Sequence, residues 1–120
     1  MVTVRTACRS GEGYRRGRMN SAPQAIRHVI IRGRVQQVGF RAWTEYTALE
    51  HGLEGWVRNR RDGAVEAVFA GPAEAVAAMV EACRQGPPGA HVESIDQRDG
   101  VASDLALRRP GDLFSVLLTA

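Results

Sequence analysis

The 120-residue sequence contains no lysine, only two cysteines and three histidines, and no long apolar run. No stretch approaches the roughly 20 consecutive apolar residues that a membrane-spanning helix requires, and the first ten residues lack the apolar block of a secretory signal. Cys8 and Cys83 form no CxxC pair and no metal-binding spacing, so we expect free thiols and a cytoplasmic location. These absences argue against an integral membrane protein, a disulfide scaffold and a zinc module.

The positive charge is concentrated near the N-terminus. All sixteen basic residues are arginine, and five of them lie in residues 1–24 beside a single acid, which gives this segment a formal charge of +4. Residues 25–120 contain eleven arginines and twelve acids, a formal charge of −1. A nucleic-acid-binding domain usually carries its positive charge on the folded body. We therefore expect neither a nucleic-acid partner nor a membrane partner, and we predict a disordered basic tail over 1–24 followed by one folded domain over 25–120.

Hydrophobic periodicity divides the folded part into strands and helices. Residues 40–52 and 73–85 have helical spacing, and the second helix carries a single apolar stripe. Residues 99–112 read as a polar connection. Short β-branched or alternating runs predict strands over 25–32, 53–59, 64–70, 90–98 and 113–118. The order β-α-β-β-α-β, with a short extra strand at the end, predicts an α+β fold. It is the ferredoxin-like split βαβ sandwich, with two helices on one face of an antiparallel sheet.

A loop flanked by glycines joins the first strand to the first helix. It runs from Gly33 to Gly39, and Arg41 follows in the first turn of the helix. Free backbone N–H groups and the helix dipole make such a helix start a potential anion site, and an arginine adds a bidentate phosphate donor. A loop of this kind is also common as a simple strand-to-helix turn, so by itself it does not decide between the two interpretations.

Two longer segments carry a resemblance to a known family. GRVQQVGFR at 33–41 and GWVRNRRDGAVEAVFAG at 55–71 together closely resemble the acylphosphatase family, and the resemblance extends over roughly residues 26–118. It implies a small enzyme that hydrolyses carboxyl-phosphate anhydrides such as acetyl phosphate without a metal or any other cofactor. The chain departs from the family pattern at Gln37, where glycine is usual.

The resemblance also implies roles for individual residues. Arg41 corresponds to the catalytic arginine that holds the substrate phosphate, and Asn59 to the residue that positions the attacking water. Backbone N–H groups of the loop would complete the phosphate site; the binding residues implied are Gln36, Gln37, Val38, Gly39, Phe40 and Arg41. Asn59 could otherwise be only a turn residue before the hairpin at 60–63.

The chemistry is consistent with so few functional side chains. An acyl phosphate is an activated anhydride with a good carboxylate leaving group, so the protein has to bind the phosphoryl oxygens and place a water in line. Asn59 cannot act as a general base because an amide takes no proton at neutral pH, so the substrate phosphate is expected to accept the proton of the water. The predicted topology makes the first two strands parallel, which places the loop and Asn59 at the same rim of the sheet.

Two alternatives remain open at this point. Gln37 could have abolished turnover and left a non-catalytic phosphate- or anion-binding module. An RNA-binding module can use the same topology, but it stacks bases on sheet aromatics, of which the strands at 25–32 and 64–70 hold only Phe69. We expect a monomeric enzyme acting on a small acyl phosphate.

Overall fold

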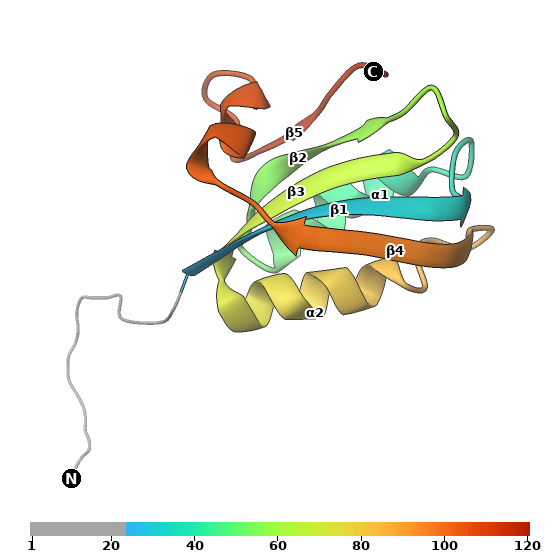
Figure 1. Cartoon of the computed structure of the whole chain (residues 1–120), viewed down its shortest axis with the longest axis horizontal. Helices are drawn as coiled ribbons and strands as arrows, with labels where there is room; N and C mark the ends of the chain where they lie inside the picture. Colours follow the sequence, from blue (N-terminus) through green and yellow to red (C-terminus); the bar gives the residue numbers. More distant parts are fainter. Residues whose placement is uncertain (1–23) are drawn as a thin grey trace, which may run out of the picture.

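The computed structural model describes residues 24–120 and consists of a five-stranded sheet with two helices on one face (Figure 1). The elements in chain order are β1 (Gln24–Arg34), α1 (Phe40–Glu50), β2 (Glu54–Asn59), β3 (Val65–Pro72), α2 (Ala73–Cys83), β4 (His91–Asp99), the 3₁₀ helix η2 (Ala102–Leu107) and β5 (Phe114–Val116). The predicted ferredoxin-like α+β fold is confirmed. The strand β1 begins at Gln24, and the rest of the predicted tail lies outside the described residues.

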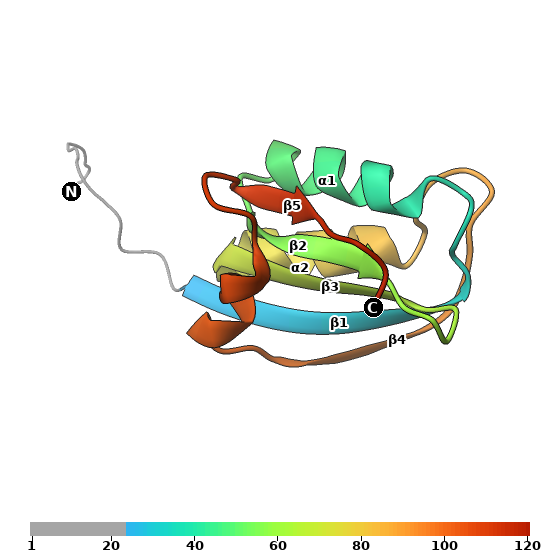
Figure 2. The ribbon, with the colours of Figure 1, turned by 90° about the horizontal axis from the view of Figure 1, so that it is seen from above.

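The strands follow the order β4-β1-β3-β2-β5 in the sheet. β1 pairs antiparallel with β3 and β4, and β2 pairs antiparallel with β3, so β1 and β2 run parallel with β3 between them, as expected. β5 pairs parallel with β2 (Figure 2). The sheet is therefore mixed, whereas the sequence predicted an antiparallel sheet. The reason is that a long connection through η2 precedes β5, so no hairpin forces it to run against its neighbour.

The core lies between the sheet and the two helices. Strand alternation turns Val29 and Ile31 of β1 and Val57 of β2 toward the helices, and all three are fully buried. The predicted apolar stripe of α2 packs against them; its buried residues are Val76, Met79, Val80 and Cys83. Among residues 24–120, no helix is long and apolar enough to cross a membrane.

The opposite face of the sheet is partly covered by η2, which the sequence did not predict. Trp56 of β2 points to this face and is 1% exposed, and its Nε1–H donates a hydrogen bond of 2.6 Å to the carbonyl of Asp104 in η2. The connection at 99–112 therefore covers a buried aromatic side chain, although its polar composition suggested only a solvated loop.

A polar cluster lies beside Trp56 on the same face. Nε2 of His28 donates to one carboxylate oxygen of Glu66 over 2.6 Å, and Nε of Arg58 donates to the other over 2.8 Å. The guanidinium of Arg58 also lies 4.8 Å from the centroid of the Trp56 ring. Burial alone would raise the pKa of Glu66, but the hydrogen bonds from His28 and Arg58 outweigh it and lower that pKa below its usual value. The cluster fixes β1, β2 and β3 to one another.

Candidate active site

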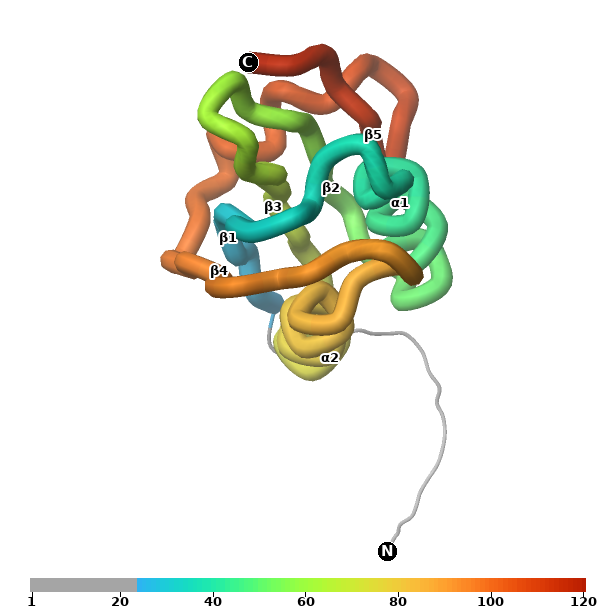
Figure 3. Tube along the Cα trace, turned by 90° about the vertical axis from the view of Figure 1, so that its right-hand side faces the viewer, coloured from blue at the N-terminus to red at the C-terminus, as the bar shows by residue number. Residues whose placement is uncertain are grey.

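The loop between β1 and α1 is anchored at both ends by buried apolar side chains. Val35 is 1% exposed and Phe40 is 2% exposed, while Gln37 and Gly39 between them are exposed. The loop crosses the end of the sheet, where the β2–β3 hairpin and the C-terminal segment also lie (Figure 3). Its ends are therefore fixed by the core, while its middle is presented to solvent at one rim.

Two left-handed backbone conformations shape this loop. Gln37 has φ 63° and Gly39, the N-cap residue of α1, has φ 78° and ψ 20°. Within the described chain, none of the backbone N–H groups of residues 36–42 donates a hydrogen bond to another protein group. Left-handed residues in a tight turn direct successive N–H groups toward a common point, and the start of α1 adds the positive end of its dipole. The geometry is that of a site for an anion.

Arg41 lies in the first turn of α1 beside these N–H groups. Its side chain is half-buried, and its closest polar contact is a long one of 3.5 Å from a guanidinium nitrogen to the carbonyl of Leu117. It forms no ion pair with any acid in residues 24–120, and the first turn of α1 contains no acidic residue. The positive charge of Arg41 is therefore available to an anionic ligand.

Asn59 is the last residue of β2 and lies on the same face of the sheet as α1. It has the same strand parity as Val57, whose side chain is buried beneath the helices. The backbone N–H of Leu117 donates to the carbonyl of Val57 over 2.8 Å, so the Leu117 peptide that Arg41 contacts lies directly alongside β2. The structure thus brings Arg41 close to the strand that ends in Asn59. The amide of Asn59 is half-buried and makes no hydrogen bond with other described residues.

The side chain of Gln36 connects the loop to the β2–β3 hairpin. Its Nε2 group donates two hydrogen bonds, one of 2.7 Å to the carbonyl of Arg60 and one of 2.9 Å to the carbonyl of Ala64. The sequence suggested only the backbone N–H of Gln36 as a binding group and gave no signal for this side-chain role. Such a signal would have required knowing that two hairpin carbonyls face the loop.

Gln37 is the only non-glycine residue with positive φ among those that the structure describes. The residue is exposed, and its side chain makes no polar contact with other described residues. The backbone N–H is the group that the proposed phosphate site uses, and glutamine keeps it. The departure from the family pattern therefore introduces backbone strain without removing a donor.

The arginines of the hairpin are largely neutralised. Arg58 pairs with the buried Glu66, and Arg60 contacts Asp62 over 3.1 Å, whereas the side chain of Arg61 has no partner within residues 24–120. These residues border a hollow of about 350 Å³ beyond the end of β2. The ion pairs reduce the positive field that a row of arginines would otherwise present near Asn59.

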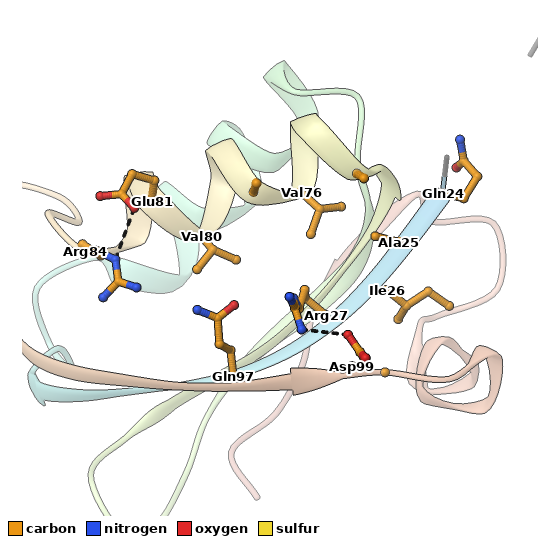
Figure 4. Close-up of a pocket in the computed structure, with 13 residues that line it drawn as sticks. Gln24, Ala25, Ile26, Arg27, Val76, Val80, Glu81, Arg84, Gln97 and Asp99 are labelled. Carbon is orange, nitrogen blue, oxygen red and sulfur yellow. Dashed lines mark hydrogen bonds and ion pairs between the residues drawn. The ribbon is translucent and has the colours of Figure 1, made fainter. Parts of the chain in front are cut away.

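A larger hollow lies away from the loop. It measures about 550 Å³ and lies between α2 and the beginning of β1, whereas the loop follows the end of that strand (Figure 4). Its charged side chains are already paired, Arg27 with Asp99 over 2.7 Å and Arg84 with Glu81 over 3.3 Å. The described part of the chain contains no group of three or more His, Cys, Asp or Glu side chains that could hold a metal ion.

Comparison with known proteins points to one family. A model of the Acylphosphatase family matches residues 27–104, a range that includes the loop, Arg41 and Asn59. The chain is 57% identical over 94 residues to a protein of Rhodopseudomonas palustris (strain BisB18) named Acylphosphatase. The aligned residues cover 78% of this chain and 95% of the relative. It is 59% identical over 96 residues to an Acylphosphatase of Bradyrhizobium diazoefficiens, with 80% and 97% covered.

Solved structures give the same result. An acylphosphatase from Coxiella burnetii superposes with a TM-score of 0.68 at 32% identity, covering 78% of this chain and 93% of the other. An acylphosphatase from Bacillus subtilis superposes with a TM-score of 0.66 at 35% identity, with 77% and 97% covered. The sequence matches and the fold thus agree over the same part of the chain, and the chain belongs to the acylphosphatase family of hydrolases that act on acyl phosphates.

Proposed function

We propose that the chain hydrolyses small acyl phosphates at the start of α1, with Arg41 and Asn59 as its catalytic residues and without a metal ion. The proposal rests on three features of residues 24–120: loop N–H groups that donate no hydrogen bond, an arginine without an acidic partner beside them, and at the same rim the side-chain amide of Asn59, which has no hydrogen bond. This combination supplies a phosphate site and a means of orienting water, which are the two things that an activated anhydride needs.

The phosphoryl oxygens would bind to the N–H groups of Gln36, Gln37, Val38, Gly39, Phe40 and Arg41 and to the guanidinium of Arg41. These donors are fixed before the substrate arrives, so they stabilise the charge that spreads over the phosphoryl oxygens in the transition state. Their alignment also costs no reorganisation during the reaction. Arg41 contributes the only full positive charge among them.

The side-chain amide of Asn59 would hold a water molecule in line with the bond to the acyl oxygen. The water oxygen attacks phosphorus, the phosphorus–oxygen bond to the acyl group breaks, and the carboxylate leaves with the bonding electrons. The proton of the water passes to a phosphate oxygen, because an amide cannot accept it. The products are a carboxylate and inorganic phosphate, and no redox step or additional reactant is needed.

Hydrolysis of benzoyl phosphate, followed by its ultraviolet absorbance, tests this function directly. We expect turnover that inorganic phosphate inhibits competitively, because phosphate would occupy the same donors. A chain that binds phosphate but shows no turnover would instead be the non-catalytic anion-binding module. The relatives are named as enzymes, and Gln37 is exposed and keeps its N–H group, so neither observation favours that alternative.

We further propose that the enzyme is monomeric and cytoplasmic. The thiol of Cys83 is free and lies in the core, which agrees with a reducing compartment. Sedimentation equilibrium at micromolar concentration tests the first part, and fractionation of cells expressing the full chain tests the second.

A further inference from the structure

The phosphate loop and the strand that carries Asn59 are not adjacent in the sheet, so their separation must be set by something other than strand pairing. The ladder between β1 and β3 ends at the pair Ile31–Val65, and beyond this point β1 pairs only with β4. At Gly33 the strand passes so close to β4 that a Cβ atom would lie 2.2 Å from the carbonyl oxygen of His91. The end of β1 is therefore held toward β4, on the side of the sheet away from β2.

The side chain of Gln36 spans this gap. Its two hydrogen bonds reach the backbone carbonyls of Arg60 and Ala64. Arg60 directly follows Asn59, and Ala64 directly precedes Val65, which pairs with Asn59 across the two strands. The same two carbonyls also accept bonds within the hairpin, from Gly63 over 3.1 Å and from Arg60 over 2.8 Å. One amide thus ties the loop to both strands at the base of the hairpin, on either side of the residue pair that includes Asn59.

Glutamine fits this position better than glutamate or asparagine. Both acceptors are carbonyl oxygens, so the group between them must supply two N–H donors, and a glutamate carboxylate would supply none and repel both. Asparagine has the correct amide but is shorter by one carbon–carbon bond, about 1.5 Å, and cannot reach both carbonyls from the same backbone. The other polar contact between the two segments, Arg32 to Asp62 at 3.7 Å, joins exposed side chains and constrains geometry weakly.

We propose that Gln36 is a positioning residue, which sets the distance between the phosphate held by the loop and the water held by Asn59. The proposal rests on the proposed role of Asn59. In-line attack depends on this distance, and a displacement of about 1 Å can lower a rate by about 100-fold. Loss of the Gln36 bridge changes this distance while leaving Arg41 and the backbone donors in place.

The test is a double-mutant cycle measured with benzoyl phosphate. Gln36→Ala should lower kcat by about 10- to 100-fold, with a much smaller change in the inhibition constant of inorganic phosphate. Gln36→Asn, the mildest change, should show the same split with a smaller loss. In an Asn59→Ala background, Gln36→Ala should cause little further loss, because the water that it helps to position is no longer held. Arg32→Gln is the matched control: it removes the contact to Asp62, together with the ion pair of Arg32 with Asp96 over 3.3 Å, and should leave kcat unchanged.

The outcomes separate this inference from the proposed function. Wild-type chain without turnover would overturn the function itself. A normal kcat in Asn59→Ala would overturn the role of Asn59 in holding the water, and with it the proposal that Gln36 positions that water. Independent, multiplicative losses for Gln36→Ala and Asn59→Ala would overturn the positioning role alone. Gln36 variants that melt at lower temperature but keep wild-type kcat when folded would show that the bridge serves stability only.

Discussion

Replacing Gln37 by glycine tests how the phosphate loop tolerates a side chain at a left-handed position. At φ 63° the Cβ atom of an L-residue crowds the following carbonyl, which costs about 1–2 kcal/mol. Glycine avoids this cost but gains freedom in the unfolded chain, which offsets about 0.5–1 kcal/mol. The difference predicts that Gln37→Gly stabilises the protein by about 0.8 kcal/mol, with an upper limit of about 1.5 kcal/mol. The substitution loses no buried side-chain contact, because Gln37 is exposed.

For a domain of this size, 1 kcal/mol corresponds to a shift in Tm of about 4–8 °C, so we expect a rise of several degrees in a calorimetric or circular-dichroism melt. Gln37→Ala is the matched control, because alanine keeps the Cβ atom and therefore the strain. It should leave Tm unchanged or lower it. Gln37→Asn should fall between them, since asparagine tolerates the left-handed region better than most residues.

Activity gives a second measurement on the same variants. Since the loop is proposed to bind phosphate through N–H groups that every residue here retains, Gln37→Gly should change kcat/KM by less than about tenfold, or about 1.4 kcal/mol. An equal rise in Tm for Gln37→Ala would refute the strain argument, because it would locate the effect in the side chain. An inert wild type that gains strong activity as Gln37→Gly would show that the side chain blocks the site.

Four further predictions concern the site and the core. Arg41→Ala should lower kcat/KM for benzoyl phosphate by at least about 100- to 1000-fold in a folded chain, and Arg41→Lys should recover only part of it, because a point charge replaces the bidentate fork; near-normal turnover would remove Arg41 from the mechanism. Asn59→Ala should depress kcat far more than it raises KM, and steady-state kinetics showing the reverse split would assign Asn59 to binding. Activity should survive EDTA, since residues 24–120 hold no cluster of metal-binding side chains, and a loss restored by Mg²⁺ would contradict this. The pKa of Glu66 is lowered on folding, so ionised Glu66 stabilises the protein above pH 4.5, the usual pKa of a glutamate, and this stabilisation is lost as the pH falls through the lowered pKa. The free energies of urea unfolding of wild type and Glu66→Gln should therefore differ most near neutral pH and converge in acid.

The helices and the antiparallel strands were predictable because each has a local signal. The stripe of α2 at Val76, Met79, Val80 and Cys83 is buried as its spacing predicts, and the Asp-Gly turn at 62–63 joins β2 and β3. The direction of β5 and the existence of η2 were not predictable in this way. The first depends on where a long connection returns to the sheet, and the second on the indole of Trp56, which needs an acceptor that Asp104 supplies from 48 residues away.

The candidate site likewise contains groups that the sequence predicts and groups that only the structure shows. Arg41 and Asn59 are visible in the sequence because their proposed roles use side chains, and a motif records side chains directly. The backbone donors are invisible as residue types, since every residue except proline has an N–H, and only the conformation at positions 37 and 39 makes them converge. The bridge from Gln36 is harder still to predict, because its two partners are main-chain carbonyls of Arg60 and Ala64, whose own side chains play no part in the contact. A mutational scan of the hairpin side chains would therefore miss the position where loop and strand are joined. Substitution of Gln36 itself would reveal it, since the proposed mechanism has two catalytic side chains and a third, that of Gln36, which need not touch the substrate.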